Sequence, residues 1–259
     1  QNNAPTFNNA GTFRKSGGNG TDGTRIEGFA AFNNTGILQV QTGTLHFNTT
    51  PFLQTAGSTT LDGRLIATNP IFSGGTFVAN VDQLGLGLTF NGSATATFNS
   101  TNHLSSLTLA DTSAVVSEGG NKVLVLDDLA ITGSGRLDLK NNSMVRRYTG
   151  TSAIGSWDGS AYTGITGLVQ SGSNGGEWNG NGIITSMSVV DSGATRTLGV
   201  NESMVLGIED GQTILWKGVT VDSDSVIVMY TYSGDIDLNG EINGDDYFYI
   251  DSNILVQDP

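Results

Sequence analysis

The chain has 259 residues, of which 37 are glycine and none is cysteine, and its formal net charge at pH 7 is −13. The acidic balance argues against binding to nucleic acid or to anionic membranes, because both need Lys and Arg against phosphate. The missing cysteines exclude disulfides and cysteine-ligated zinc. Hydrophobic residues still make up 37% of the chain, so it can bury a core.

The N-terminal half contains a repeated unit that begins with phenylalanine. Copies start at Phe7, Phe32, Phe52 and Phe72, spaced 25, 20 and 20 residues apart. In the copy at residues 32–47, alternating polar and apolar residues predict strands over 37–40 and 44–47. Asn and Gly tolerate positive φ, so we expect a bend at residues 33–34 before Gly36 and a corner at Gly43.

A period of about 20 residues is typical of stacked units that cannot bury their apolar faces alone. Leucine-rich repeats have a similar period, but their L-x-x-L-x-L skeleton is absent from the sequence. We therefore predict an all-β fold, a parallel β-helix (solenoid), over residues 1–150. Further strand candidates lie at 84–90, 104–109, 123–126 and 136–139. At roughly 21 residues per coil, this region holds about seven coils.

The composition changes near residue 150, because all three tryptophans lie beyond it, at Trp157, Trp178 and Trp216. Residues 226–232 alternate little and are strongly apolar, which predicts a long buried strand. We interpret residues 151–233 as a β-rich continuation that caps the C-terminal end of the solenoid. The tryptophans are then either buried in this cap or exposed as platforms for sugar rings.

Residues 234–259 carry the most specific motif of the chain, a twelve-residue loop with oxygen-bearing residues at alternate positions. The predicted metal ligands are Asp235, Asp237, Asn239, Glu241 (through its backbone carbonyl), Asn243 and Asp246. Gly240 lies at position 6, where a calcium loop needs a sharp turn. The pattern predicts a Ca²⁺ site followed by a short helix with Tyr247, Ile250 and Ile254 on one face.

The loop differs from a standard EF-hand, because position 12 is Asp rather than Glu and no helix precedes it. This pattern resembles one half of a bacterial dockerin module. Upstream, residues 137–150 (LDLKNNSMVRRYTG) are similar to the last coil of large bacterial extracellular proteins with autotransporter-type β-strand repeats. Residues 175–186 (GGEWNGNGIITS) and 197–199 resemble the segment that joins such coils to a dockerin-like loop. The resemblance implies a secreted or cell-surface β-helix of a kind whose members mostly lack an assigned activity.

Signals for catalysis are weak in this sequence. His46 and His103 are the two histidines, and neither has a metal-ligand spacing such as H-E-x-x-H. The acidic residues of the coils are scattered along the chain, and Asp127 and Asp128 beside Arg136 are the one grouping worth testing against the two poised carboxylates that a glycosidase needs. We therefore predict that the protein is not an enzyme.

Three functions follow as hypotheses. The first is an extracellular structural protein, a fibre or stalk subunit that self-associates head-to-tail, because the repeat begins at Phe7 and leaves the first coil without a cap. The second is an adhesin or glycan-binding solenoid that binds cell-surface polysaccharide and is anchored through its dockerin-like end. The third is a polysaccharide lyase or hydrolase. The chain opens at Gln1 without a basic, apolar leader, which we interpret as a secreted product whose signal peptide has been removed.

Overall fold

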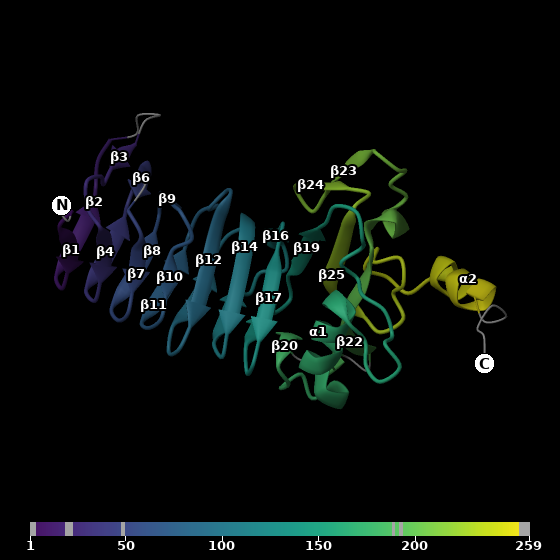
Figure 1. Cartoon of the computed structure of the whole chain (residues 1–259). Helices are drawn as coiled ribbons and strands as arrows, with labels where there is room; N and C mark the ends of the chain where they lie inside the picture. Colours follow the sequence, from purple (N-terminus) through teal and green to yellow (C-terminus); the bar gives the residue numbers. More distant parts are fainter. Residues whose placement is uncertain (1–3, 19–22, 48–49, 188–189, 192–193, 254–259) are drawn as a thin grey trace.

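The computed structural model describes residues 4–18, 23–47, 50–187, 190–191 and 194–253. The chain forms a β-solenoid of about six turns, followed by β-rich C-terminal sheets and two short helices (Figure 1). The predicted parallel β-helix is confirmed, with about six turns in place of seven. None of the helices in the described part of the chain is long and apolar enough to cross a membrane.

Two sheets run along the solenoid and a third joins its first three turns, and strands of successive turns pair in parallel within each. Sheet A contains, in spatial order, β1 (Thr6–Asn9), β4 (Ala31–Asn34), β7 (Phe52–Gln54), β10 (Ile71–Phe72), β12 (Leu86–Asn91), β14 (Asn102–Ala110), β16 (Val123–Leu126) and β19 (Ser143–Arg147), with β17 (Leu129–Thr132) also on β14. Sheet B contains β2 (Thr12–Lys15), β5 (Ile37–Val40), β8 (Ser58–Leu61), β11 (Thr76–Ala79), β13 (Thr95–Phe98), β15 (Ser113–Val116), β18 (Arg136–Asp138) and β20 (Gly182–Ile184). Sheet C contains β3 (Thr24–Arg25), β6 (Thr44–Phe47) and β9 (Arg64–Ala67).

In the first three turns the repeated unit has three strands rather than the two that the sequence predicted. The strands at 37–40 and 44–47 are confirmed as β5 and β6, with Leu38 and Val40 buried on the inner face. Gly43 turns the corner with φ +64°. The bend expected at Asn33–Asn34 is wrong, because both residues belong to β4. Asn34 is fully buried, and hydrogen bonds to the side chains of Asn9 and Gln54 satisfy its amide.

A column of phenylalanine rings forms the core. The four phenylalanines that begin the repeated units were expected to align, and three of them do. Phe7, Phe32 and Phe52 occupy one register row, with centroids 5.0 and 5.7 Å apart and nearly parallel rings. Phe72 instead aligns with Gln54, two residues further along the strand. The reason is that the first residue of β11 comes four positions after Phe72, whereas the first residue of β8 comes six positions after Phe52.

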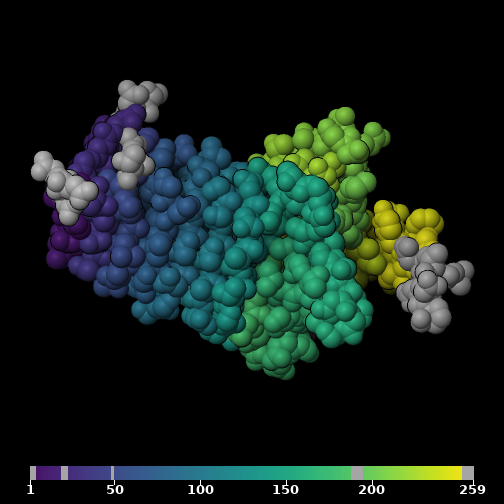
Figure 2. All heavy atoms as spheres, in the orientation of Figure 1, coloured from purple at the N-terminus to yellow at the C-terminus, as the bar shows by residue number. Residues whose placement is uncertain are grey.

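The C-terminal region closes part of the last turn. Sheet A continues from β19 into the antiparallel strands β25 (Ser225–Tyr232), β22 (Ala194–Glu202) and β21 (Val190–Asp191). Helix α1 (Gly164–Ser173) packs against β20, and β23 (Thr213–Trp216) pairs with β24 (Val219–Asp222). Short 3-10 helices span Asn174–Gly176 and Ser203–Leu206, and α2 (Gly244–Asn253) follows the last strand. The first turn and α2 lie at opposite ends of the elongated molecule (Figure 2).

The limits of this C-terminal region at residues 150 and 233 stay a prediction. The long strand expected at 226–232 is β25, which begins one residue earlier.

Candidate metal centre

The predicted calcium loop follows β25 and is fixed to the outer face of sheet A. Leu238 is 2% exposed and packs in a cluster with Val125, Val145 and Ile227, which come from three neighbouring strands. From β22, the side chain of Asn201 donates a hydrogen bond of 3.0 Å to the carbonyl of Ile236. The loop is therefore held by the sheet before any ion is considered.

Three carboxylates meet inside this loop. Oxygens of Asp235, Asp237 and Asp246 lie within 4.8 Å of one another, and this acidic group could hold a metal ion. Asp235 and Asp246 are 4% and 1% exposed. Two oxygens on opposite sides of a Ca²⁺ ion are about 5 Å apart, since each Ca–O distance is about 2.4 Å. Both the spacing and the all-oxygen donors therefore fit Ca²⁺.

Backbone N–H groups of the loop orient these carboxylates. Asp235 accepts from the N–H of Asn239 at 3.1 Å and of Gly240 at 2.9 Å, and from the hydroxyl of Thr231. Asp246 accepts from the N–H of Ile236 at 2.7 Å. Gly240 takes a positive φ of +93°, which supplies the sharp turn that the sequence predicted.

Helix α2 begins with a reciprocal cap that uses two of the predicted ligands. The side-chain oxygen of Asn243 accepts from the N–H of Asp245 at 2.7 Å. The carboxylate of Asp246 accepts from the N–H of Asn243 at 2.8 Å. This is a capping box, which satisfies two N–H groups that the helix leaves without partners. Capping thus turns the Asp246 carboxylate back toward Asp235.

The other predicted ligands lie around this group. Asn239 donates its side-chain N–H to Asp237 at 2.9 Å, which places the amide beside the carboxylates. The side chain of Glu241 is exposed, in keeping with a role through its backbone carbonyl. Roles for Asn239, Glu241 and Asn243 as ligands stay predictions. Sequence reasoning missed Leu238, although an apolar residue between ligands is a signal that one side of the loop faces the core.

The surroundings of Asp237 and Asp246 shift the pKa values of the two carboxyl groups in opposite directions. Burial raises the pKa of Asp237, and the nearby charges of Asp246 and Asp235 raise it further. Burial would also raise the pKa of Asp246, but the N–H groups of Asn243, Ile236 and Asp237 hold it below its ordinary value. A bound cation would remove the repulsion at Asp237, because it stabilises the ionised form.

The predicted helix after the loop is present as α2, but its apolar face is not buried. Tyr247 and Ile250 are 62% and 43% exposed. Ile254, the third residue of the predicted face, lies outside the described residues.

The acidic pair Asp127 and Asp128 does not meet Arg136. Asp128 pairs with Arg146 at 2.9 Å, and Asp127 with Arg147 at 3.4 Å. Arg136 lies in β18 of sheet B, whereas these pairs join the segment between β16 and β17 to β19 of sheet A. The sequence reasoning failed here because neighbours in the chain are separated by a corner of the solenoid.

The histidines and tryptophans have ordinary structural surroundings. Nδ1 of His103 lies 2.7 Å from the carboxylate of Asp82, and His46 lies in β6. Trp178 is 9% exposed and packs in the core, whereas Trp157 is 55% exposed and meets the ring of Tyr162 edge-on. The third tryptophan, Trp216, is partly buried beside Val219 and Val221.

The fold and the acidic group define a β-solenoid protein with a candidate metal centre at its C-terminal end. No family model, no curated protein and no solved structure matches the chain. The likeness to dockerin-bearing extracellular proteins therefore stays a prediction from the quoted residues.

Proposed function

We propose that the protein is a non-enzymatic extracellular structural protein, a subunit of a fibre or surface stalk that assembles head-to-tail through its β-helix ends. One observation carries this proposal. Among the described residues, β1, β2 and β3 of the first turn pair with the next turn on one side and have no partner on the other. Phe7 and Phe13 are half-buried at this open face. Unpaired strand edges beside apolar side chains favour the addition of another chain.

The distribution of charge supports a contact between opposite ends. Residues 1–47 carry three basic and two acidic side chains, whereas residues 194–253 carry two basic and eleven acidic ones. Opposite charges steer association and set its orientation. Because α1 and β25 cover much of the last turn, the proposed joint places the open strand edges of one copy against the cap of the next.

Sedimentation velocity and electron microscopy over a range of protein and salt concentrations test this assembly. We expect chains that lengthen with protein concentration and shorten with salt, since exposed charges are screened. Phe7→Lys is expected to remove assembly, whereas Ile37→Lys, on the outer face of sheet B, is expected to leave it unchanged. Monodisperse monomers of the unmodified protein at high concentration would refute the proposal.

Calcium is proposed to stabilise the C-terminal end through Asp235, Asp237 and Asp246, whose spacing carries that part of the proposal. Thermal unfolding with and without a chelator tests it. An unchanged midpoint after chelation would show that no divalent cation contributes to stability.

Binding of an acidic glycan is a second candidate function, favoured by a groove of about 310 Å³ on the outer face of sheet B. Thr95, Thr97 and Ser113 line it, together with Arg136 and Asp138. The Arg136 guanidinium makes no hydrogen bond or ion pair within the described part of the chain, while Asp138 bonds Ser186 and Lys140. A free guanidinium beside hydroxyls suits a carboxylate or sulfate on a sugar.

A glycan array separates this candidate from the first. Arg136→Gln is expected to abolish retention of acidic glycans, whereas Arg14→Gln, in the first turn of the same sheet, leaves it unchanged. Incubation of the same polysaccharides with the protein, followed by analysis for shortened chains, tests for the lyase or hydrolase activity that we do not expect.

A further inference from the structure

Among the described residues, strand β17, near the C-terminal end of the solenoid, has a neighbour on one side alone. The first half of β14 pairs with β16 and its second half with β17. Sheet A continues beyond β16 into β19 and β25, but no described residue pairs with the other edge of β17. The chain leaves the turn after β19 ends at Arg147, so the place that the next strand would take beside β17 is left open.

The open edge of β17 presents backbone hydrogen-bonding groups. The carbonyl of Asp128 accepts from the N–H of Leu107 at 3.0 Å, and that of Thr132 accepts from Asp111 at 3.2 Å. Peptide groups alternate in direction along a strand, so those of Leu129 and Ile131 face away from β14. Such an edge can pair with a further extended strand.

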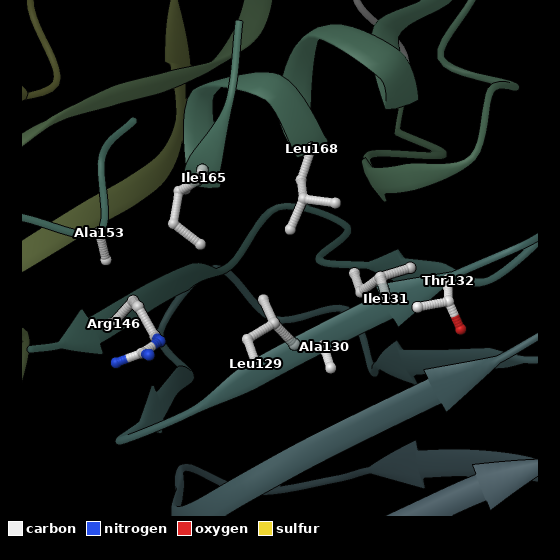
Figure 3. A pocket seen from close by; sticks show the side chains of 9 residues that line it. Leu129, Ala130, Ile131, Thr132, Arg146, Ala153, Ile165 and Leu168 are labelled. Atoms are coloured by element: carbon white, nitrogen blue, oxygen red, sulfur yellow. The ribbon is translucent and has the colours of Figure 1, made fainter. Parts of the chain in front are cut away.

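An apolar pocket of about 410 Å³ adjoins this edge, between β17 and α1 (Figure 3). Leu129 and Ile131 project from the strand, and Ile165 and Leu168 project from the helix toward them (Figure 3). The volume lies within the range of about 300–1,000 Å³ that is typical of ligand sites. The edge of β17 would pair with the backbone of an extended segment, and the pocket would accept the apolar side chains of the same segment.

The surroundings limit what can enter. Helix α1 packs so closely on β20 that a Cβ atom on Gly172 would lie 2.0 Å from the carbonyl oxygen of Ile183. The strand of sheet B in the turn of β17 is β18, which is already paired with β20, and α1 lies on β20. A complete coil of a second copy therefore has no room to stack there. A single extended segment needs the edge of β17 alone.

The one charged side chain among the described residues that line the pocket is Arg146, at the end where Leu129 lies (Figure 3). Its guanidinium donates to Asp128 at 2.9 Å and to the carbonyl of Arg147. These contacts engage two of the five N–H donors of a guanidinium. Further donors remain for a carboxylate on an incoming chain.

We propose that the open edge of β17 and its pocket form a docking site for one extended segment of a partner protein. The segment carries branched apolar side chains at alternate positions and a carboxylate at the end that meets Arg146. This function goes beyond the assembly proposed above, because it uses neither the first turn nor the acidic loop, which is the predicted calcium loop that contains Asp235, Asp237 and Asp246.

Isothermal titration of the full chain with a synthetic peptide, acetyl-Asp-Val-Thr-Val-Thr-Val-amide, tests the site. Two further peptides carry N-methyl groups on alternate amides, on one edge or on the other. Pairing along one edge predicts that one of these two binds like the parent and the other does not bind. Equal binding of the two methylated peptides, or no saturable binding of the parent at millimolar concentration, overturns the proposal.

Variants locate the peptide on the protein. Arg146→Gln is expected to weaken the parent peptide about tenfold, as a lost charge-assisted bond would, and to leave a peptide with Asn in place of Asp unchanged. Arg147→Gln, which breaks a neighbouring ion pair outside the pocket, is expected to have no effect. Equal losses in the two variants overturn the assignment. If the peptide instead dissociates oligomers of the protein, the occupant is a second copy and the partner assignment is wrong.

Discussion

Glycines at the corner between sheets A and B let successive turns approach closely. A Cβ atom on Gly57 would lie 1.9 Å from the carbonyl oxygen of Gly36, and one on Gly75 would lie 2.2 Å from that of Gly57. Gly57 also has a positive φ of +72°. The glycines therefore form a column that follows the axis of the solenoid.

Gly57→Ala is expected to destabilise the protein by about 2–4 kcal/mol, because the methyl group meets backbone and the conformation is strained. Gly11→Ala is the matched control from the first turn, since a Cβ there has nothing within 4 Å. We expect the control to change stability by about 0.5 kcal/mol or less. Denaturant unfolding of the two variants measures the difference, and equal effects would contradict the close approach.

In the acidic loop, Asp246 both caps α2 and joins the candidate metal group. At a free Ca²⁺ concentration a hundred times the Kd, binding to the folded protein is expected to add about 2.7 kcal/mol to stability. Asp246→Asn is expected to abolish this increment, whereas Asp251→Asn, on the exposed part of α2, retains it. Thermal unfolding with and without Ca²⁺ measures both variants. A calcium response that survives in Asp246→Asn would show that this carboxylate is not a ligand.

The turn at Asp158 supplies a prediction of pH dependence. The N–H of Ala161, then the N–H and hydroxyl of Ser160, lower the pKa of the Asp158 carboxyl. Since the folded pKa lies below the unfolded one, the carboxylate favours the folded turn at neutral pH. This contribution is lost as the pH falls through the folded pKa, below about 4. Carboxyl NMR is expected to show a higher midpoint in Ser160→Ala, and an unchanged midpoint would contradict the role of the hydroxyl.

At the scale of elements, a chain of buried amides joins three turns of sheet A. Asn9 donates to Asn34 at 2.7 Å, and Asn34 donates to Gln54 at 2.9 Å. The hydroxyl of Thr59 completes the network by donating to the side-chain amide oxygen of Gln54 at 2.7 Å. Because these groups are shielded from water, removing one leaves its neighbours without their partners.

Asn34→Ala is therefore expected to destabilise the protein by about 2–3 kcal/mol. The adjacent residue Asn33 bonds Asn8 at 3.0 Å on the exposed face, so Asn33→Ala is a control expected to change stability by about 0.5 kcal/mol or less. Denaturant titration compares the two variants. A larger loss in the exposed variant would contradict the view that burial sets the strength of these ladders.

The sequence predicted those elements whose pattern depends on their own residues. Alternation located β5 and β6, and the apolar run at 226–232 located β25. Register depended on loop length, which is why Phe72 aligns with Gln54 rather than with Phe52. Helix α1 was missed because Gly164, Gly167 and Gly172 are poor helix formers. Tertiary contact overrides this preference, since Gly172 allows the helix to touch β20. Ile165 and Val169, buried four residues apart, were the available signal.

The candidate site was predictable to a similar extent. Positions 1, 3 and 12 of the loop pattern converge as the acidic group, because the turn at Gly240 and the helix cap at Asn243 are both local in sequence. The attachment of the loop through Leu238 to strands more than 80 residues earlier was not predictable. It depends on the path of the whole solenoid, as does the open edge of β17.

At the scale of the whole molecule, each turn after the first pairs with its neighbouring turns, so stability is transmitted between neighbours. At one end, Leu238 of the acidic loop lies over Gly199 of β22 and belongs to the apolar cluster that also contains residues of β16, β19 and β25. The turns formed by residues 31–98 are linked to this end by strand pairing only through the turns between them, by β14 and β16 in sheet A and by β15 and β18 in sheet B. The stabilising effect of an ion bound in the loop can therefore reach the first turns only through a series of interfaces between turns. Each of these interfaces can open locally.

Hydrogen exchange with and without Ca²⁺ is expected to show this decay. Added Ca²⁺ should slow exchange in residues 194–253 and in β16 and β19, and leave β4, β5 and β8 unchanged, because local opening near the first turn does not break the loop. Asp246→Asn should show no response in either region. Uniform slowing along the chain would instead mean that the solenoid opens as one cooperative unit, and a response confined to β4, β5 and β8 would place the ion elsewhere.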